Sequence, residues 1–322
     1  MRKARCACNL STGLGTATVD RRSRSVHLSQ YLTKRQQQID RFLERCIPRA
    51  THADALIQAM RYTLFSGGKR IRPILALAAT EAVGGSATTT LPFACAVELI
   101  HTYSLIHDDL PALDNDELRR GKPANHVVFG EAMAILAGDA LLTEAFRVMA
   151  EAAAKAGAWQ GRALQLLIEV AHAAVARGMV AGQAADMSAE GSAVDLPTVE
   201  LIHIRKTGSL IRAAVRGGAL LGGARPEQLR RLTRYGELLG LAFQIVDDIM
   251  DAEASTKITG KPPSRDRVRH KATFPAVLGL PAAKERAEEL FADTVKELRS
   301  FGTRAAPLRE IARLIVGRAC PV

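Results

Sequence analysis

The chain has 322 residues, of which 48% are hydrophobic, and a formal net charge of +11 at pH 7. No Gly-, Ser- or Pro-rich linker divides it, so we expect one large domain. Gly, Arg or Glu interrupts the longest apolar runs before the roughly 18 residues needed to span a bilayer, which argues against stable membrane insertion and predicts a soluble, cytoplasmic protein. Five cysteines without a CxxC pair indicate neither a disulfide framework nor a zinc site.

The first 26 residues differ in composition from the rest of the chain. They are rich in Ser and Thr, and they lack the apolar stretch of roughly 7 to 15 residues that marks a secretory signal. Their basic side chains, against Asp20 alone, are Arg2, Lys3, Arg5, Arg21, Arg22 and Arg24. We therefore predict a basic, disordered N-terminal extension over residues 1–26 and one folded domain over residues 27–322. A transit peptide and translation from an upstream start are the alternatives.

From Leu28 onward, apolar residues recur at the spacing of helices. Clear examples are residues 39–47 (IDRFLERCI), 234–251 (RYGELLGLAFQIVDDIMD) and 282–301 (AAKERAEELFADTVKELRSF). No strand-like alternation of apolar and polar residues persists. Gly and Pro cluster where such helices should end, as in SGGKRIRP, AVGGSATTTLP and RGGALLGGARP. The sequence predicts an all-α fold.

An acidic stretch at residues 103–126 reads YSLIHDDLPALDNDELRRGKPANH. Asp108 and Asp114 are six residues apart, and at about 100° per residue a straight helix would put them on different faces. Pro111 lies between them, lacks an N–H and clashes with the carbonyl four residues earlier, so we expect the helix to end or bend there. The two carboxylates could then face a second acidic group across a cavity.

The second acidic cluster consists of Asp247, Asp248 and Asp251 at the end of an apolar helical run. Positions three and four apart share a helix face, so Asp251 lies beside the other two, and without a cation the three charges would repel one another. A solvated helix end is one interpretation. A magnesium site is the other, because Mg²⁺ takes a few carboxylates and completes its octahedron with water and phosphate oxygens.

Basic side chains are concentrated where they could hold phosphate groups. GGKRIRP, residues 67–73, places three of them at a loop-to-helix boundary, where free backbone N–H groups also suit an anion. Each alone would be a solvated surface charge, but together with two acidic clusters they indicate an anionic substrate bridged by metal. The candidates are Lys69, Arg70, Arg72, Arg119, Arg120, Lys206, Lys261 and Lys271.

Nucleic acid is a further candidate partner, because of the net charge and the basic run RDRVRHK at residues 265–271. The chain has no recognisable nucleic-acid-binding motif and no aromatic residues interleaved with the basic ones. Much of the excess positive charge is also in the N-terminal extension. We therefore expect no nucleic-acid partner.

These motifs together resemble the short-chain trans-polyprenyl diphosphate synthases, and within them the bacterial-type farnesyl diphosphate synthases. The resemblance covers roughly residues 28–318, and two DDxxD-type motifs with GGKRxRP are specific to that family. It implies an isoprenoid synthase fold, a single large helical domain with a central active-site cavity, usually in a homodimer. The matching segments are GGKRIRP, HTYSLIHDDLPALDNDELRRGKPANH, FGEAMAILAGDALL, GMVAGQAADM, HIRKTGSLIRAAV, FQIVDDIMD, TGK and HKATFPAVLGL.

The resemblance also implies a role for each site residue. About three Mg²⁺ ions would join the allylic diphosphate to Asp108, Asp114, Asp247 and Asp251. Catalysis would depend on Asp108, Asp114, Lys206, Asp247 and Asp248. The allylic substrate would contact Arg119, Lys206, Thr207, Gln244, Lys261 and Lys271. Isopentenyl diphosphate would be held without metal by Lys69, Arg72, His101 and Arg120.

Product length depends on how deep the cavity runs below the acidic cluster, and Tyr103, five residues before Asp108 and so a little over one helical turn deeper, is able to place its ring beneath the growing chain. In the resembled family an aromatic residue here, with the two-residue insertion that makes DDxxxxD, goes with the fifteen-carbon product, (2E,6E)-farnesyl diphosphate. A plain core aromatic is the alternative reading of Tyr103. Geranylgeranyl diphosphate synthase of the same family and an idle partner subunit are the alternative functions.

The C-terminus departs from the resembled family. Its members often end in a basic tail that closes over the site, whereas this chain ends IVGRACPV, with Arg318 as the last charged side chain. We therefore expect weaker closure of the site.

Overall fold

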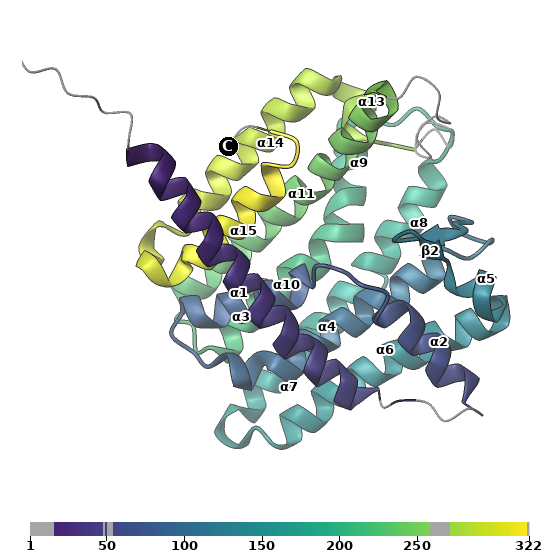
Figure 1. Cartoon of the computed structure of the whole chain (residues 1–322), viewed down its shortest axis with the longest axis horizontal. Helices are drawn as coiled ribbons and strands as arrows, with labels where there is room; N and C mark the ends of the chain where they lie inside the picture. Colours follow the sequence, from purple (N-terminus) through teal and green to yellow (C-terminus); the bar gives the residue numbers. More distant parts are fainter. Residues whose placement is uncertain (1–15, 48, 50–53, 258–270, 321) are drawn as a thin grey trace, which may run out of the picture.

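The computed structural model describes residues 16–47, 49, 54–257, 271–320 and 322. That part is almost entirely helical (Figure 1), and its strands form one short antiparallel hairpin in which Leu118 pairs with Pro123. The all-α prediction is confirmed. In chain order the elements are α1 (Thr16–Cys46), α2 (Ala55–Leu64), α3 (Ile71–Ala82), α4 (Ala87–Asp108), β1 (Leu118–Arg119), β2 (Lys122–Pro123), α5 (Asn125–Phe129), α6 (Glu131–Ala154), η1 (Gly157–Trp159), α7 (Gln160–Ala174), α8 (Met179–Ala189), α9 (Leu196–His203), η2 (Ile204–Gly208), α10 (Ser209–Leu221), α11 (Pro226–Lys257), α13 (Phe274–Leu278), α14 (Leu280–Glu297), η3 (Arg299–Ala305) and α15 (Ala306–Val316).

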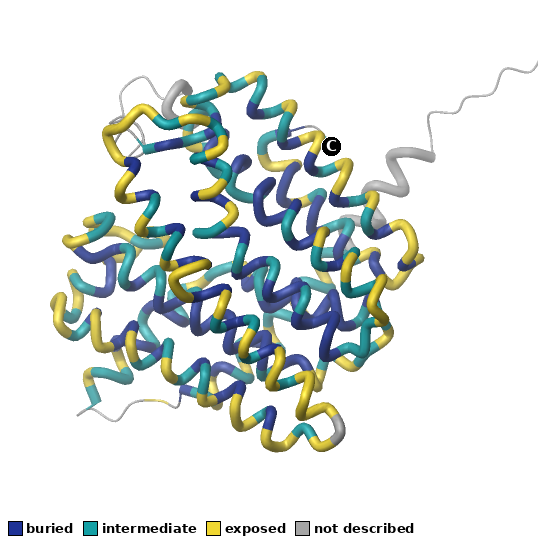
Figure 2. The backbone as a smooth tube through the Cα atoms, turned by 180° about the vertical axis from the view of Figure 1, so that it is seen from behind, coloured by how far each residue is buried: buried dark blue, intermediate teal, exposed yellow. Residues whose placement is uncertain are grey.

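The buried centre of the molecule is built from α3, α4, α10 and α11, and Figure 2 shows the buried residues gathered in the interior. Every residue of α3 from Pro73 to Thr80 is buried, because this helix is apolar all round and packs against both α4 and α10. At Gly218 of α10, an added Cβ would lie 2.0 Å from the carbonyl oxygen of Ala76. Glycine therefore permits the close approach of α3 and α10.

The helix break predicted at SGGKRIRP is confirmed by the end of α2 and the start of α3. Arg70 caps α3 in the left-handed conformation, with φ of 49°. Its buried guanidinium donates to Asp40 at 2.9 Å, to Glu98 at 2.9 Å and to the carbonyl of Leu64 at 2.7 Å. Such a paired, buried arginine fixes the turn and is not available to a ligand.

The N-terminal boundary predicted at residue 27 stays a prediction, since residues 1–15 lie outside the described residues and α1 begins at Thr16. One described stretch, Gln160–Ala189, passes by length and composition as a membrane-crossing helix, with 33% of its tested window buried. The chain leaves the helix between α7 and α8 within that stretch. The predicted absence of membrane insertion also stays a prediction.

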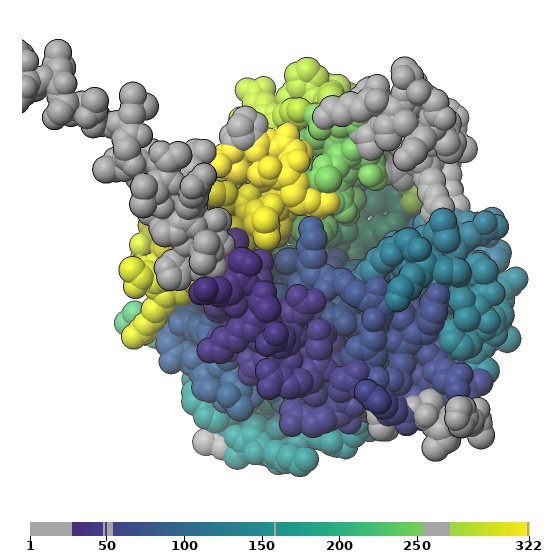
Figure 3. Space-filling view, in the orientation of Figure 1, coloured from purple at the N-terminus to yellow at the C-terminus, as the bar shows by residue number. Residues whose placement is uncertain are grey.

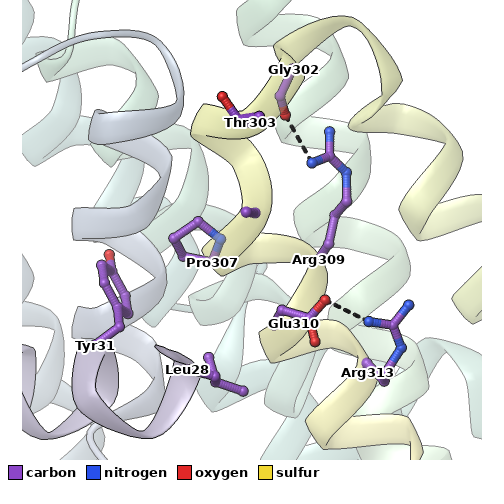
Figure 4. Close-up of a pocket in the computed structure, with 9 residues that line it drawn as sticks. Leu28, Tyr31, Gly302, Thr303, Pro307, Arg309, Glu310 and Arg313 are labelled. Atoms are coloured by element: carbon purple, nitrogen blue, oxygen red, sulfur yellow. Dashed lines mark hydrogen bonds and ion pairs between the residues drawn. The ribbon is translucent and has the colours of Figure 1, made fainter. Parts of the chain in front are cut away.

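A hollow of about 780 Å³ lies between α1 and the C-terminal elements η3 and α15 (Figure 4). Leu28 and Tyr31 of α1 lie on one side of it and Pro307 on the other. Arg309 donates to the carbonyl of Gly302 at 2.8 Å along its edge. None of the site residues predicted above is among the described residues that line this hollow.

Candidate active site

The acidic stretch after α4 folds back on the end of that helix. α4 ends at Asp108, three residues before Pro111, as its sequence predicted. The N–H of Asp114 then donates to the carbonyl of Asp108 at 2.8 Å, and Asn115 takes a left-handed conformation with φ of 45°. This return of the chain holds Asp114 beside the helix end, which a straight helix would not do.

One cavity of about 590 Å³ brings most of the predicted site residues together. In Figure 3, the surface is hollowed between the yellow and green segments on one side and the blue and teal segments on the other. The cavity is lined by side chains from α3, α4, α8, η2 and α11 and from the loop after α4. Of the predicted residues, it is lined by Arg72, His101, Tyr103, Asp108, Arg119, Arg120, Lys206, Thr207, Gln244 and Asp247.

The two acidic clusters each contribute one carboxylate to this cavity, Asp108 from α4 and Asp247 from α11. Burial raises the pKa of Asp108 to about 6, opposed by Lys206 and reinforced by Asp114. Burial also raises the pKa of Asp247, although Arg318 donates to its carboxylate at 3.0 Å and lowers it. Within the described residues, no three His, Cys, Asp or Glu side chains lie close enough to hold a metal by themselves.

Asp248 is turned away from the cavity, because adjacent helical residues project about 100° apart. It is 5% exposed and accepts hydrogen bonds from the N–H of Phe274 at 3.1 Å and from the amide of Gln244 at 3.2 Å. Its carboxylate also lies 2.8 Å from Nε2 of His203. These contacts position α11 against α9 and α13, so the geometry gives Asp248 a positioning role, and its catalytic role stays a prediction.

Asp109 is a functional residue that the sequence reasoning missed. Its carboxylate is buried and accepts from Nε of Arg119 at 3.0 Å, while Asp116 lies 3.7 Å from the same guanidinium. Arg119 is thereby held at the edge of the cavity. The adjacent carboxylates in DDLPALD, Asp108 and Asp109, could have suggested two roles: one residue contacts the ligand and the other binds the arginines that follow.

Lys206 is carried by the π-helical turn η2 and is held by Asp186 of α8. Its Nζ lies 2.6 Å from the carboxylate of Asp186, which also lies 3.7 Å from Lys271. Burial raises the pKa of Asp186, but the ammonium of Lys206 outweighs it, and the pKa is lower than usual. Lys271 in turn lies 3.2 Å from Asp114. Alternating charges therefore connect the first acidic stretch to η2. Asp186, the acidic residue in GMVAGQAADM, was the sequence signal for this connection, and the sequence prediction did not include it.

Thr207, beside Lys206, donates to the amide oxygen of Gln244 at 2.8 Å. Gln244 then donates to Asp248, so η2 and α11 are tied together under the cavity. A second glutamine, Gln183 of α8, lines the cavity with both amide atoms buried and without a hydrogen-bond partner among the described residues. Buried polar groups are normally satisfied, so Gln183 is free to bond a ligand, and the sequence reasoning missed it.

Arg72, His101 and Arg120 form the basic side of the cavity. Burial lowers the pKa of Arg72, and its Nε is buried without a partner in the described part of the chain. Burial and the nearby guanidinium of Arg72 hold the pKa of His101 well below its usual range, so its imidazole is neutral. An added Cβ at Gly68 would lie 2.9 Å from the guanidinium of Arg120, so this glycine leaves room for the arginine.

Tyr103 is both a core residue and a lining residue of the cavity. It is 6% exposed, and its ring meets the ring of His107 edge to face at 5.6 Å between centroids. Burial raises the pKa of its hydroxyl to about 12. The phenol is therefore neutral, and its ring forms part of the cavity wall one turn below Asp108.

Five of the predicted site residues that the structure describes do not line the cavity: Lys69, Asp114, Asp248, Asp251 and Lys271. Lys69 is exposed in the turn before α3, and Asp251 is exposed one turn beyond Asp247. Asp114 directly follows Leu113, which lines the cavity, and lies 3.2 Å from Lys271. Lys261 lies outside the described residues.

The comparisons agree with this geometry. A family model described as polyprenyl synthetase matches residues 53–304. A farnesyl diphosphate synthase of Geobacillus stearothermophilus is 47% identical over 291 residues, which cover 90% of this chain and 98% of that protein. A geranylgeranyl diphosphate synthase of Cyanophora paradoxa is 45% identical over 293 residues, covering 91% and 97%. The solved apo structure of an FPP/GFPP synthase from Zymomonas mobilis aligns with a TM-score of 0.81 at 39% identity, covering 90% and 99%. The resemblance seen in the sequence is confirmed, and the chain belongs to the polyprenyl synthetase family.

Proposed function

We propose that this protein is a prenyltransferase that condenses isopentenyl diphosphate with dimethylallyl diphosphate and then with geranyl diphosphate, giving (2E,6E)-farnesyl diphosphate. The observation that carries the proposal is one cavity in which Asp108 and Asp247 meet arginines, a lysine and the ring of Tyr103. Membership of the family and 47% identity to a farnesyl diphosphate synthase support it.

Magnesium fits the acidic residues of the cavity. The raised pKa of Asp108 reflects a partly buried, desolvated carboxylate that a cation would stabilise, and Mg²⁺ prefers a few carboxylate oxygens completed by phosphate oxygens and water. We expect about three ions per active site, held by Asp108, Asp114, Asp247 and Asp251. When bound, they would supply charge stabilisation for the departing diphosphate.

The allylic diphosphate would lie between the acidic residues and the basic group formed by Arg119, Lys206 and Lys271. Asp109 and Asp186 hold two of these cations in place before the substrate arrives, so little reorganisation is needed. Thr207 and Gln244 would bond the remaining diphosphate oxygens. Breaking of the allylic C–O bond then leaves an allylic cation and free diphosphate, with the new negative charge held by these residues.

Isopentenyl diphosphate would bind on the side of Arg72, His101 and Arg120. The buried Nε of Arg72 has no partner among the described residues, so a phosphate oxygen would satisfy it. The double bond then attacks the allylic cation, forming one C–C bond, and a proton passes to the released diphosphate to restore an alkene. Leu105, Met179 and Phe243 line the same cavity and would exclude water from the cation.

Geranylgeranyl diphosphate synthase is the second candidate, because a geranylgeranyl diphosphate synthase is 45% identical to this chain. The position of Tyr103 in the cavity wall favours the shorter product, since its ring would meet the growing chain one turn below Asp108. The prediction of farnesyl diphosphate therefore depends on one side chain.

We also propose a cytoplasmic homodimer. Exposed apolar side chains occur along the neighbouring elements α5 to α8, which pack against one another in sequence. A contiguous exposed apolar surface marks an interaction site, and a second copy of the chain would cover it. The exposed residues are Val127, Val128, Ile135, Leu136, Leu164, Ile168, Val175 and Val180.

The test is a product assay. Purified protein and Mg²⁺ are incubated with labelled isopentenyl diphosphate and, in turn, dimethylallyl, geranyl or farnesyl diphosphate, and the products are sized by chromatography. Turnover of the first two but not of farnesyl diphosphate is the expected result. Extension of farnesyl diphosphate would favour the longer-chain synthase, and no turnover with any of the three would refute the prenyltransferase proposal.

A further inference from the structure

A separate cavity, of about 740 Å³, lies between α7, α9, α10, α11 and α14. We call it the basic cavity, because six arginines and three glutamates line it. Its charged residues are Arg177, Arg205, Arg212, Arg216, Arg234, Arg286, Glu169, Glu200 and Glu237. None of these residues lines the active-site cavity. The excess of guanidinium groups favours an anionic ligand.

The glutamates fix some of the arginines and leave others available. Arg216 donates to Glu169 at 2.7 Å, and Arg212 donates to Glu237 at 3.1 Å. By contrast, the side chains of Arg177 and Arg205 have no hydrogen-bond or ion-pair partner among the described residues. The paired arginines set the shape of the basic cavity. Arg177 and Arg205 can turn their N–H donors to a ligand, and the planar guanidinium group matches the geometry of phosphate.

One wall of the basic cavity is apolar. It is formed by Ala173, Ile204, Leu238, Leu241 and Leu290. A purely inorganic anion would leave this wall in contact with water, whereas a ligand with a hydrocarbon chain would cover it. The cavity therefore suits a ligand that combines a phosphate group with an apolar chain.

The basic cavity shares the π-helical turn η2 with the active site. Ile204 and Arg205 of η2 line the basic cavity, while Lys206 and Thr207 line the active-site cavity. The turn is packed closely on both sides: an added Cβ at Gly182 would lie 2.1 Å from the N of Lys206, and one at Gly240 would lie 2.7 Å from Cα of Gly208. A ligand that binds Arg205 therefore acts on the turn that holds Lys206.

We infer that the basic cavity is a second binding site, for an organic diphosphate with an apolar chain, and that its occupancy is coupled to the active site through η2. The binding part of this inference stands apart from the proposed function, because it needs no turnover. The coupling part rests on that function. Both the prenyl diphosphates of the reaction and other lipid-like diphosphates have this chemistry.

Binding is tested by titration calorimetry in EDTA with two probes, inorganic pyrophosphate and the unreactive farnesyl thiodiphosphate. The test variant is Arg177→Gln with Arg205→Gln, and the control is Arg147→Gln with Arg230→Gln, which makes the same change of charge on exposed helical surface. We expect the wild type and the control to bind one more equivalent of farnesyl thiodiphosphate per chain than the test variant. Equal stoichiometry and affinity in all three proteins would overturn the site.

The two probes separate the head group from the chain. Farnesyl thiodiphosphate should bind the basic cavity at least about tenfold more tightly than pyrophosphate, because its chain covers the apolar wall. Equal affinities would overturn the claim for an apolar chain and leave an anion site only. If the double variant does not fold, as judged by thermal unfolding, Arg177→Gln alone serves instead, since Arg177 is exposed in the turn before α8.

Coupling is tested by steady-state kinetics with geranyl and isopentenyl diphosphates in the presence of farnesyl thiodiphosphate. Competition in the active site raises KM for geranyl diphosphate in every protein. Occupancy of the basic cavity should in addition change kcat in the wild type and the control, but not in the test variant. A purely competitive pattern in all three would overturn the coupling. An enzyme without any turnover would refute the proposed function, while the calorimetric stoichiometry still decides the binding site.

Discussion

At the scale of single residues, the two acidic motifs divide their work between adjacent carboxylates. Asp108 and Asp247 line the cavity, whereas Asp109 holds Arg119 and Asp248 holds His203 and the N–H of Phe274. The division follows from helix geometry, since neighbouring side chains project about 100° apart. Each motif therefore contains one residue that meets the ligand and one that fixes the surrounding structure.

This division predicts different effects for Asp247→Asn and Asp248→Asn. Asp248→Asn should destabilise the fold by about 1–3 kcal/mol, because two buried partners lose a charged acceptor. Asp247→Asn should leave stability almost unchanged and reduce kcat by about 10²-fold or more, because Asp247 faces the cavity. Chemical denaturation and steady-state kinetics measure the two effects. Equal losses of stability would contradict the positioning role of Asp248.

Product length provides a second prediction at this scale. Tyr103→Ala should shift the products toward twenty carbons or more, because the cavity would extend beyond the missing ring. Tyr103→Phe is the matched control and should keep the fifteen-carbon product, since the ring remains. The measurement is the chain length of the radiolabelled products of both variants, determined by chromatography. If Tyr103→Ala still stops at fifteen carbons, Tyr103 is a core aromatic and does not set the length.

The sequence predicted the residues on the cavity wall better than the residues that hold them. Arg72, Lys206 and Asp247 belong to motifs whose chemistry can be read locally. Asp186 and Gln183 lie on α8 among apolar neighbours, and their tasks depend on the packing of α8 against η2, which spacing along the chain does not reveal. Arg70 was a phosphate candidate by its motif, yet two acids from other helices take its guanidinium.

At the scale of elements, η2 is the part on which the site most depends. It lies between α8 and α11, and glycines on both helices let the backbones touch it. A π-helical turn places one more residue in the turn than an α-helix, and such turns are often found at functional sites. Here it presents Arg205 to one cavity and Lys206 to another.

Gly182→Ala tests the closeness of this packing. The added methyl group would lie 2.1 Å from the N of Lys206, so η2 must shift, with a stability loss of about 1–3 kcal/mol and a higher KM for the allylic diphosphate. Gly161→Ala in α7 is the control, because nothing lies within 4 Å of its added Cβ. That variant should keep its KM and gain up to about 1 kcal/mol. An unchanged KM in Gly182→Ala would show that η2 tolerates displacement.

Element boundaries were predictable where the cause is local. Pro111 ends α4 within a turn, and the glycines of GGKRIRP separate α2 from α3, because Pro and Gly act through their own backbone. The π-turn was not predictable. HIRKTGSLI reads as continuous helix, whereas the structure forms a π-helical turn over Ile204–Gly208 that is packed between α8 and α11.

At the scale of the whole molecule, the all-α prediction holds because apolar residues at helical spacing provide a core for one domain. The exposed apolar side chains of α5 to α8 are the part of the surface to which the homodimer proposal assigns a second copy. Their position could not be predicted from sequence, because periodicity identifies an apolar face without saying whether the same chain or another covers it.

The homodimer proposal is tested on α7. Leu164 and Ile168 are four residues apart on one helix face and are 49% and 55% exposed. Leu164→Asp with Ile168→Asp should convert a dimer to a monomer, because two charges would be buried in the interface. Sedimentation velocity measures the mass. Leu314→Asp on α15, 41% exposed on another element, should leave the dimer intact. A monomeric wild type would refute the proposal.

The contact between Arg318 and Asp247 makes loading of the active site an exchange of cations. The guanidinium of Arg318 lies 3.0 Å from Asp247, with the two side chains 29% and 40% exposed. Another cation that binds this carboxylate competes with the arginine, and a pair this exposed yields for about 0–1 kcal/mol. The C-terminal segment therefore supplies, through Arg318, a counter-ion to a carboxylate of the active-site cavity.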